Sequence, residues 1–247
     1  MAVVVTGGNG GLGSELVPEL RSGGSEVVSA SRRTGFDLST GVGVADVLAD
    51  ADVIVHAATN LRFRRVDLNG TRRLVQVLAD AGRRPHVIYV SIVGCDLNPY
   101  PYYRAKHACE IVLRQSGLPV TVVRATQFHT LIAAVAGVAQ WPLAFVPPNA
   151  ASQPADRRWV AQQLAEIVLG PVPEGYRRAT DLAGPEVITV PEAIRLVCQH
   201  RGRRIPRLIN LPAVGGMLTS FAARTNLPGA DVVTGGRRFA DWLATQP

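Results

Sequence analysis

Residues 2–22 read AVVVTGGNGGLGSELVPELRS, and this stretch decides the fold. Ala2 to Thr6 form an apolar, β-branched run that is typical of a buried strand. Gly7, Gly10 and Gly13 follow it, and the residues from about Leu12 to Ser22 show helical spacing. Glycine permits positive φ in the turn and a close approach of the backbone to a pyrophosphate, which also meets the N–H groups of the helix N-terminus. We therefore expect a dinucleotide site built from Gly7, Asn9, Gly10, Gly11, Leu12 and Gly13.

The rest of the first half alternates in the same way between short apolar runs and longer helical patterns. Helical spacing extends over about 66–81 and 102–116, and strand-like runs occur at 26–30, 52–56, 86–92 and 118–124, with a short third element at Phe36–Leu38. Strands that alternate with helices form a parallel sheet that is covered on both faces. The sequence thus predicts an α/β fold with a Rossmann-type doubly wound parallel sheet.

The amino-acid composition of the chain changes after about Gln140, where prolines become frequent. Ala155–Leu169 and Val190–Gln199 show helical spacing, and Thr189 is placed to cap the second of these helices. We expect a dinucleotide-binding domain over 1–140 and a small C-terminal α/β substrate-binding lobe over 141–247, packed together as a single structural unit.

Composition excludes several classes of protein. With 47% hydrophobic and 18% charged residues, the chain is not disordered as a whole. No apolar run reaches the roughly 18 residues of a membrane span, and the N-terminus does not resemble a signal peptide. The three cysteines (Cys95, Cys109 and Cys198) lack metal-site spacing, so we expect a cytoplasmic protein with no metal.

The basic residues are almost all arginine. Among the 26 lysines and arginines only Lys106 is a lysine, and the formal net charge is +7. The arginines are dispersed in pairs along the chain, whereas a nucleic-acid footprint is clustered. Binding to nucleic acid is therefore not expected, and direct DNA binding is the weakest hypothesis.

The end of the second predicted strand selects the cofactor. An acidic residue at this position would accept a hydrogen bond from the ribose 2′-hydroxyl of NAD, but the sequence has Ser31, Arg32 and Arg33. A hydroxyl and a guanidinium suit a 2′-phosphate. These residues favour NADP(H) over NAD.

Tyr102 and Lys106 lie four residues apart and therefore share one face of a predicted helix. A phenol exchanges a proton near neutral pH only when its anion is stabilised, and an ammonium group one turn away does this. We expect Tyr102 to be the proton donor and Lys106 to support it and to hold the cofactor ribose. Tyr103 points about 100° away around the helix and is the weaker candidate.

Several motifs of the chain resemble those of the short-chain dehydrogenase/reductase superfamily, and most of all those of its atypical branch of NmrA-like and NAD(P)H-binding reductases. The resemblance lies in TGGNGGLG (6–13), HAAT (56–59), DLNGT (67–71), YVSIVG (89–94), YYRAKHACE (102–110) and VRATQFH (123–129). It implies that Asp37 and Leu38 contact adenine and that Ala57, Ala58 and Thr59 line the adenosine and ribose path. It also implies that Ala125, Thr126, Gln127 and Phe128 flank the nicotinamide.

The sequence departs from the superfamily at one position. The alignment places Ser91 one residue early and puts Ile92 where the superfamily has a serine that polarises the substrate. Ser91 is then expected to serve the cofactor or the turn, and a loop residue such as Asn98 is a candidate second donor. His129 follows the residues expected near the nicotinamide and is a candidate substrate contact.

These observations predict an NADPH-dependent oxidoreductase, a ketoreductase acting on a ketone or quinone-like carbonyl of a small organic substrate, which can be polycyclic. The alternative is a non-catalytic NADP(H)-sensing, NmrA-like regulatory protein that binds a protein partner. An epimerase or dehydratase that uses bound NAD(P) transiently stays open within the same scaffold. The sequence leaves open whether the protein is a monomer or a homodimer.

Overall fold

The computed structural model describes residues 1–60, 64–147, 149–210, 212 and 214–247. These residues form two units that are interleaved along the chain. Unit 1 comprises Met1–Ser91, Arg104–Arg124 and Val160–Ala179, and unit 2 comprises Ile92–Tyr103, Ala125–Trp159 and Thr180–Pro247. The expected division into 1–140 and 141–247 stays a prediction.

Unit 1 is built on a parallel sheet. Its strands lie in the order β2-β1-β3-β4-β5, and a further strand, β8, pairs with β5. Their bounds are β1 Ala2–Thr6, β2 Glu26–Ala30, β3 Val53–His56, β4 His86–Ile92, β5 Val120–Ala125 and β8 Tyr176–Arg178. The order reverses between β1 and β3, and ligands of such sheets bind beyond the carboxyl ends of the strands at this point. The predicted Rossmann-type parallel sheet is confirmed.

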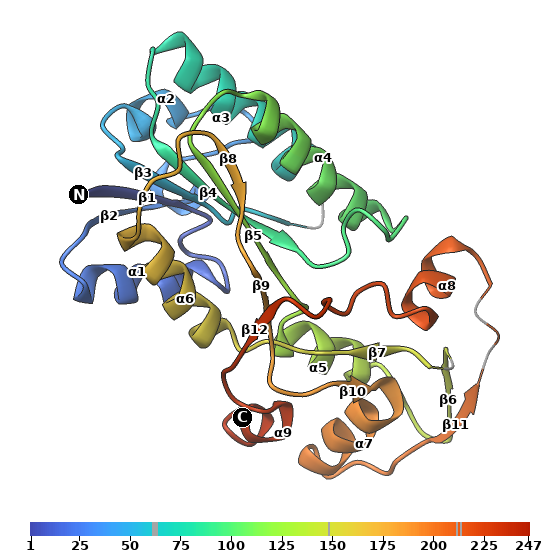
Figure 1. The fold of residues 1–247 in the computed structure, drawn as a ribbon. Coiled ribbons are helices and arrows are strands. Elements are labelled where there is room, and N and C mark those ends of the chain that lie inside the picture. Colours follow the sequence, from blue (N-terminus) through green and yellow to red (C-terminus); the bar gives the residue numbers. More distant parts are fainter. Residues whose placement is uncertain (61–63, 148, 211, 213) are drawn as a thin grey trace. The chain divides into compact units, whose positions relative to one another are not determined.

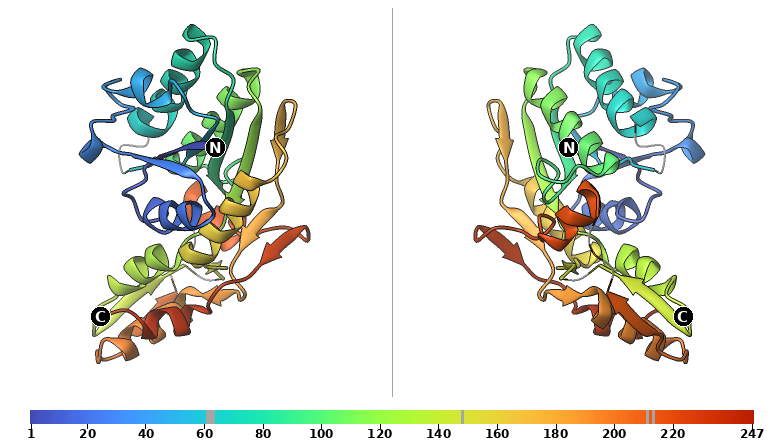
Figure 2. Two further views of the ribbon diagram at one scale, coloured as in Figure 1. Left: turned by 90° about the vertical axis from the view of Figure 1, so that its left-hand side faces the viewer. Right: turned by 90° about the vertical axis from the view of Figure 1, so that its right-hand side faces the viewer.

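Helices cover both faces of this sheet, as Figures 1 and 2 show. One face carries α1 (Gly13–Ser22) and α6 (Arg157–Leu169), and the other carries α2 (Val44–Leu48), α3 (Asn69–Asp80) and α4 (Pro101–Gln115). The inner strands β1, β3, β4 and β5 are buried almost throughout because both faces are covered, and all seven residues of β4 are buried. This burial explains their long apolar runs.

The short third element expected at Phe36–Leu38 is neither a strand nor a helix, so that prediction was wrong. Gly35 has a φ of +78°, and the Asp37 amide donates to the Val42 carbonyl. The segment therefore turns back on itself after the short 3₁₀ turn Arg32–Thr34. Phe36 and Leu38 are apolar because they are buried in the core, where they are each 3% exposed.

The described residues of unit 2 form short strand pairs and contain four complete helices. The parallel pairs are β9 (Asp181–Ala183) with β12 (Val232–Thr234) and β6 (Leu143–Val146) with β11 (Arg207–Asn210), and the antiparallel pair is β7 (Ala151–Ser152) with β10 (Ile188–Thr189). The helices are α5 (His129–Gly137), α7 (Val190–His200), α8 (Gly216–Ala222) and α9 (Phe239–Ala244). Buried residues of α5, α7 and α9 pack in one apolar cluster.

The predicted cap of α7 is confirmed. The Thr189 side chain accepts a hydrogen bond from the Glu192 amide, and the Glu192 carboxylate accepts one in return from the Thr189 amide. This reciprocal arrangement fixes the start of the helix.

None of the helices in the described part of the chain is long and apolar enough to cross a membrane.

Candidate functional site

A pocket of about 280 Å³ lies in unit 1 where β1, β2 and β3 end. Ten of the residues predicted to bind a dinucleotide line it, together with Ala30, Phe36, Asn60 and Val66. The ten predicted residues are Gly7, Asn9, Gly10, Ser31, Arg32, Arg33, Asp37, Leu38, Ala58 and Thr59. The topology thus brings together residues that lie as much as 52 positions apart in the sequence.

The glycine turn is compact in a way that excludes side chains. Gly7 has a φ of +73°, and a Cβ atom there would lie 2.9 Å from the Cα atom of Ala58. A Cβ atom on Gly13 would lie 2.6 Å from the Cα atom of Gly8. Gly7 therefore keeps the pocket open, and Gly13 lets α1 begin directly against the turn. Gly11 and Leu12 complete the turn before α1, whose N-terminal N–H groups and positive dipole end suit an anion.

The end of β2 forms the polar side of the pocket. The Ser29 hydroxyl donates to Asn9 Oδ1 at 2.5 Å and so ties the glycine turn to this strand. Ser31 Oγ is buried and has no hydrogen-bond partner among the described residues, and the Arg32 and Arg33 side chains are exposed. An unpartnered hydroxyl beside two guanidinium groups suits a phosphate oxygen.

Asp37 is held in its ionised form beside these groups. Its carboxylate accepts hydrogen bonds from the Ser39 hydroxyl at 2.7 Å and the Ser39 amide at 2.8 Å. These bonds, with a smaller contribution from Arg32, lower the pKa of Asp37 below its ordinary value although partial burial acts against them. An acceptor that stays ionised is suited to an amino group such as that of adenine.

Lys106 is not solvated but lies in a buried ion pair. Its Nζ is 3.2 Å from Asp67 Oδ1 and donates to the Val90 carbonyl at 3.0 Å, and both side chains are at most 4% exposed. The Thr59 hydroxyl, which lines the pocket, donates to the other oxygen of Asp67 at 3.1 Å. Asp67 thus connects Lys106 to the pocket.

The polar network continues from Asp67 into the sheet. The Thr71 hydroxyl donates to the Asp67 carbonyl and contacts His56 Nε2 at 3.0 Å, and His56 Nδ1 contacts the Thr6 hydroxyl at 2.8 Å. Burial, with the nearby charge of Lys106, lowers the pKa of His56 to about 3. The imidazole therefore stays neutral and serves as a fixed link between β1 and β3.

Ser91 lies away from the pocket. Its hydroxyl donates to Glu110 Oε1 at 2.5 Å, and the Arg124 guanidinium makes two hydrogen bonds to the same carboxylate, at 2.9 and 2.7 Å. The structure places Ser91 in this buried group and not among the residues that line the pocket. Ala57 lies at the end of β3, where its amide donates to the Thr6 carbonyl, and it too is outside the lining.

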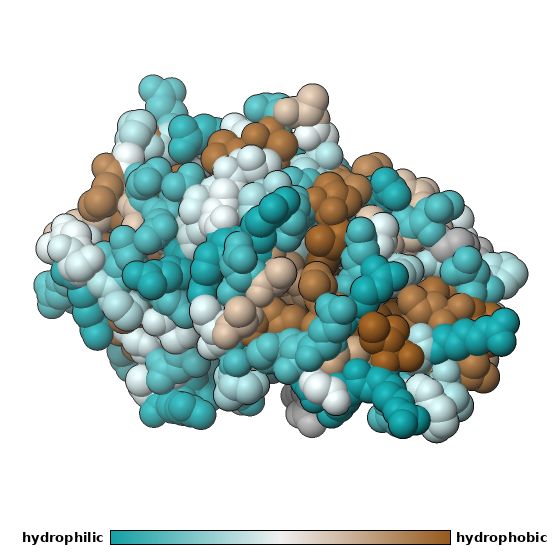
Figure 3. Space-filling model, turned by 90° about the horizontal axis from the view of Figure 1, so that it is seen from below, coloured by the Kyte–Doolittle hydropathy of each residue, from teal (hydrophilic) through white to brown (hydrophobic). Residues whose placement is uncertain are grey.

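Unit 2 contains a second, larger cavity of about 920 Å³. Ile92, Tyr102, Tyr103 and Gln127 line it, and most of the other lining residues are apolar, many of them from α5, β6 and α7. Figure 3 shows apolar side chains gathered toward the right-hand side of the face seen from below, where Figure 1 places β6. This cavity suits an apolar ligand of considerable size.

Tyr103 forms the polar wall of this cavity together with Gln127. Gln127 Nε2 donates to the Tyr103 hydroxyl at 2.5 Å, and the Ser152 hydroxyl donates to Gln127 Oε1 at 3.0 Å. Burial raises the pKa of Tyr103 far above its ordinary value, so this phenol stays protonated. Tyr102 is only half-buried and also lines the cavity.

Several residues predicted to contact nicotinamide or substrate lie outside this cavity lining. Ala125 pairs with Leu182 of β9, Thr126 donates to the Gln153 carbonyl, and Phe128 caps α5. Asn98 is 2% exposed and accepts a hydrogen bond from the Tyr100 amide, which stabilises a turn. Of the residues predicted near the nicotinamide, the cavity lining contains Gln127.

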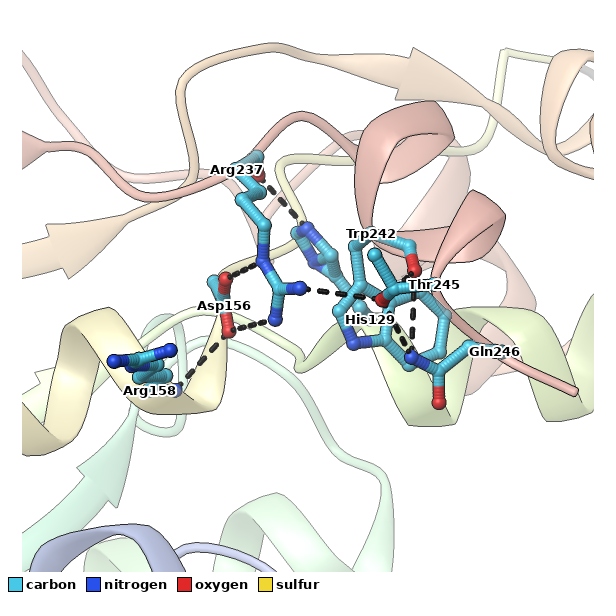
Figure 4. Close-up of polar contacts among 7 residues, drawn as sticks. All are labelled: His129, Asp156, Arg158, Arg237, Trp242, Thr245 and Gln246. Atoms are coloured by element: carbon cyan, nitrogen blue, oxygen red, sulfur yellow. Dashed lines mark hydrogen bonds and ion pairs between the residues drawn. The ribbon is translucent and has the colours of Figure 1, made fainter.

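His129 belongs to the core of unit 2. It packs edge-on against Phe239 and Trp242, and its Nε2 lies 2.9 Å from the Arg237 carbonyl (Figure 4). Arg237 in turn forms an ion pair with Asp156 at 2.6 Å. The structure does not bring His129 to the cavity, and it explains the residue as a fixed element of packing.

This placement of His129 predicts a pH-dependent stability. Burial lowers its pKa from 6.5 to about 4, Arg237 and Arg157 act in the same direction, and Asp156 opposes them. Between pH 6.5 and 4 the unfolded chain binds a proton that the folded chain does not, so stability present above pH 6.5 is lost as the pH falls through this window. We expect His129→Gln to remove roughly 1–3 kcal/mol of this dependence in urea unfolding.

The matched control is the exposed His200, at the end of α7. His200→Gln removes an exposed imidazole and gives the reference for the loss of one histidine. If His129→Gln retains the full pH dependence of the parent, the buried neutral state of His129 is refuted.

Comparisons with known proteins place this geometry in a family. A family model for NAD(P)H-binding domains matches residues 7–168, which is more than half of the chain. The chain belongs to the NAD(P)H-binding family. This confirms the predicted assignment to an NAD(P)H-binding family. A search of curated proteins found no match.

Solved structures with the same fold include an NADPH-dependent quinone oxidoreductase, QOR2 from Escherichia coli, complexed with NADPH. It is 16% identical, the alignment covers 98% of each chain, and the TM-score is 0.70. The dTDP-glucose 4,6-dehydratase DesIV from Streptomyces venezuelae is 18% identical over 99% of this chain and 95% of that one, with a TM-score of 0.67. RMD from Pseudomonas aeruginosa, complexed with NADPH, is 18% identical over 85% and 87%, with a TM-score of 0.62.

The pocket of this NAD(P)H-binding chain fits a nicotinamide dinucleotide. A Cβ atom at Gly7 would intrude on its wall, and the buried Ser31 Oγ lacks a partner at the end of β2. Both features are explained by a phosphate-bearing ligand that approaches the backbone closely. The coarse prediction of a nicotinamide cofactor is confirmed.

Sequence reasoning missed Asp67, and it missed Ser152 and Asn226 in the cavity of unit 2. Asp67 lies in the quoted motif DLNGT, and an acid at the start of a helix in a chain with one lysine is a signal for a buried ion pair. Ser152 and Asn226 have no such signal, because only the tertiary fold brings them to the cavity that the predicted Gln127 also lines.

Proposed function

We propose that this protein is an NADPH-dependent reductase of a ketone or quinone-like carbonyl. The observation that carries the proposal is that Tyr102, which shares a helix with Lys106, lines an apolar cavity large enough for a ring system. The dinucleotide pocket and the membership of an NAD(P)H-binding family support a nicotinamide cofactor. The likeness to a quinone oxidoreductase supports a carbonyl of this class.

When bound by pocket residues such as Gly7, Arg32 and Asp37, NADPH would supply the hydride for the proposed reaction. The Tyr102 hydroxyl gives its proton to the carbonyl oxygen, so that hydride and proton together convert the C=O of a ketone to CH–OH, or a quinone to its hydroquinone. Lys106 is one turn away on α4 and is fixed by Asp67, so it supplies a positive charge at a constant position. The phenol is reprotonated from solvent after each turnover.

The site lacks the second hydroxyl expected from the superfamily pattern. Ile92 lines the cavity at that position, and Ser91 is engaged by Glu110. Loss of one donor to a developing oxyanion lowers a rate by about 10²–10³-fold. We therefore expect a modest kcat with carbonyls that need strong polarisation and better turnover with quinones, which accept hydride more readily.

NADPH oxidation in the presence of quinones and cyclic ketones tests the proposal. Turnover that requires both the carbonyl and NADPH would support it, whereas tight NADPH binding without oxidation by any carbonyl would refute it. That second result, together with recovery of a stable protein partner, would instead favour a regulatory NADP(H) sensor. The isoleucine at the position of the superfamily serine is the observation that favours this alternative.

The preference for NADP(H) rests on Ser31 and Arg32 in the pocket lining. We expect Arg32→Ser to raise the Kd of NADPH about tenfold and to leave the Kd of NADH nearly unchanged, because only NADPH carries the 2′-phosphate. Calorimetric titration at fixed ionic strength measures both constants.

Arg72→Ser on α3 is the control for this variant, since it removes an exposed arginine outside the pocket lining. It should leave both constants unchanged. Equal loss of NADPH and NADH affinity in Arg32→Ser would show that Arg32 does not discriminate between the cofactors.

A further inference from the structure

The cavity of unit 2 contains a buried hydrogen-bond acceptor without a donor. Asn226 lines the cavity and is 1% exposed, and its Oδ1 has no hydrogen-bond partner among the described residues. A buried amide oxygen is normally satisfied by a donor. The missing donor is therefore a feature of the cavity that requires an explanation.

The orientation of this amide is fixed by chemistry. Asn226 Nδ2 donates to the Ala151 carbonyl at 2.9 Å, and the reverse orientation would set two oxygens against each other. The backbone of Gly94 packs closely against that of Asn226, since a Cβ atom on Gly94 would lie only 3.3 Å from the Asn226 Cα atom. Gly94, with a φ of +77°, permits this close approach.

The turn that carries Asn226 is strained. Arg224 has a φ of +59°, and its Nε donates to the carbonyl of Asn149, which has a φ of +61°. Non-glycine residues rarely adopt this conformation, and such strain tends to persist at functional sites. Two strained residues bonded to each other thus hold the segment that presents Asn226.

The neighbouring polar groups do not satisfy Asn226. The Ser152 hydroxyl donates to Gln127, and Gln127 donates to Tyr103. These hydrogen bonds do not involve Asn226 Oδ1. Much of the remaining lining is apolar, from residues such as Ile132, Phe145 and Ile194. A ligand in this cavity thus meets mostly apolar walls and, at Asn226, a buried acceptor that lacks a donor among the described residues.

We propose that Asn226 selects ligands that combine an apolar ring system with a hydroxyl or N–H donor, which its Oδ1 accepts. If the cavity serves the reductase proposed above, the preferred substrates are hydroxylated aryl ketones or hydroxyquinones. The selectivity itself concerns binding and needs neither cofactor nor turnover.

A pair of matched ligands tests this assignment on the unaltered protein. 1-Naphthol and 1-methylnaphthalene differ by a hydroxyl in place of a methyl group of similar size. Without an acceptor the more apolar methyl compound binds more tightly. With Asn226 acting as proposed, 1-naphthol binds about tenfold more tightly, as measured by calorimetric titration. Tighter binding of 1-methylnaphthalene would overturn the proposal.

Variants of two amides that line the same cavity complete the test. Asn226→Leu should abolish the preference for 1-naphthol, whereas Gln140→Leu, which removes an exposed amide, should retain it. An unchanged preference in a folded Asn226→Leu protein would refute the role of Asn226.

If NADPH-dependent reduction is found while the ligand preference is absent, the proposed function survives and this inference fails. If the preference is found without any reduction, this inference stands and the reductase proposal fails.

Discussion

Replacement of Tyr102 by phenylalanine is expected to lower kcat for carbonyl reduction by about 10²–10⁴-fold, the usual contribution of a positioned general acid. The variant keeps the aromatic ring that lines the cavity and removes only the hydroxyl that is proposed to give the proton. Because that proton is transferred in the transition state, kcat and kcat/KM should fall together while the Kd of NADPH is unchanged. Steady-state kinetics with a quinone or ketone substrate measure this.

Tyr100→Phe is the matched control, since Tyr100 lines the same cavity and is exposed. It should turn over within a few-fold of the parent. If Tyr102→Phe is as active as Tyr100→Phe, the proton comes from elsewhere, and the protonated Tyr103 hydroxyl would be the next group to test.

Asp67→Asn is expected to lower the free energy of unfolding by about 3–5 kcal/mol, because it leaves the Lys106 ammonium buried without its counter-charge. Lys106 is 3% exposed and cannot reach solvent while its Nζ donates to the Val90 carbonyl. Urea unfolding monitored by circular dichroism gives this difference.

Asp80→Asn is the control, because Asp80 is an exposed carboxylate at the end of α3 that bonds to Gln76. It should change the free energy of unfolding by less than about 1 kcal/mol. The double variant Asp67→Asn, Lys106→Met removes both charges and should regain most of the loss. If Asp67→Asn alone is as stable as Asp80→Asn, the ion pair does not hold this region together.

The sequence was most informative where chemistry and local structure coincide. The glycine turn, Arg32, Asp37 and Thr59 were predicted near one dinucleotide, and the structure brings them to one pocket. Each follows a strand, and the carboxyl ends of parallel strands meet at one edge of the sheet. The order of strands was therefore enough to gather residues that are distant in sequence.

The same reasoning was less informative where tertiary packing decides the role of a residue. His129 and Asn98 are polar and follow predicted strands or turns, as site residues do, but one packs on Phe239 and the other supports a turn. Lys106 was expected to act as a charge beside Tyr102, and its pairing with Asp67 depends on a contact across 39 positions. No local pattern reports such a contact.

The interleaving of the two units has a consequence for how the chain folds as it is synthesised. Unit 1 is complete only when Val160–Ala179 has emerged, because that segment supplies β8 and most of α6. By then two of the three stretches of unit 2 have already left the ribosome, and its last stretch, Thr180–Pro247, is still to come. We therefore expect unit 1 to be completed only after most of the chain has been synthesised. Until residue 179 emerges, the edge of β5 lacks its partner β8 and exposes unpaired backbone groups to other nascent chains.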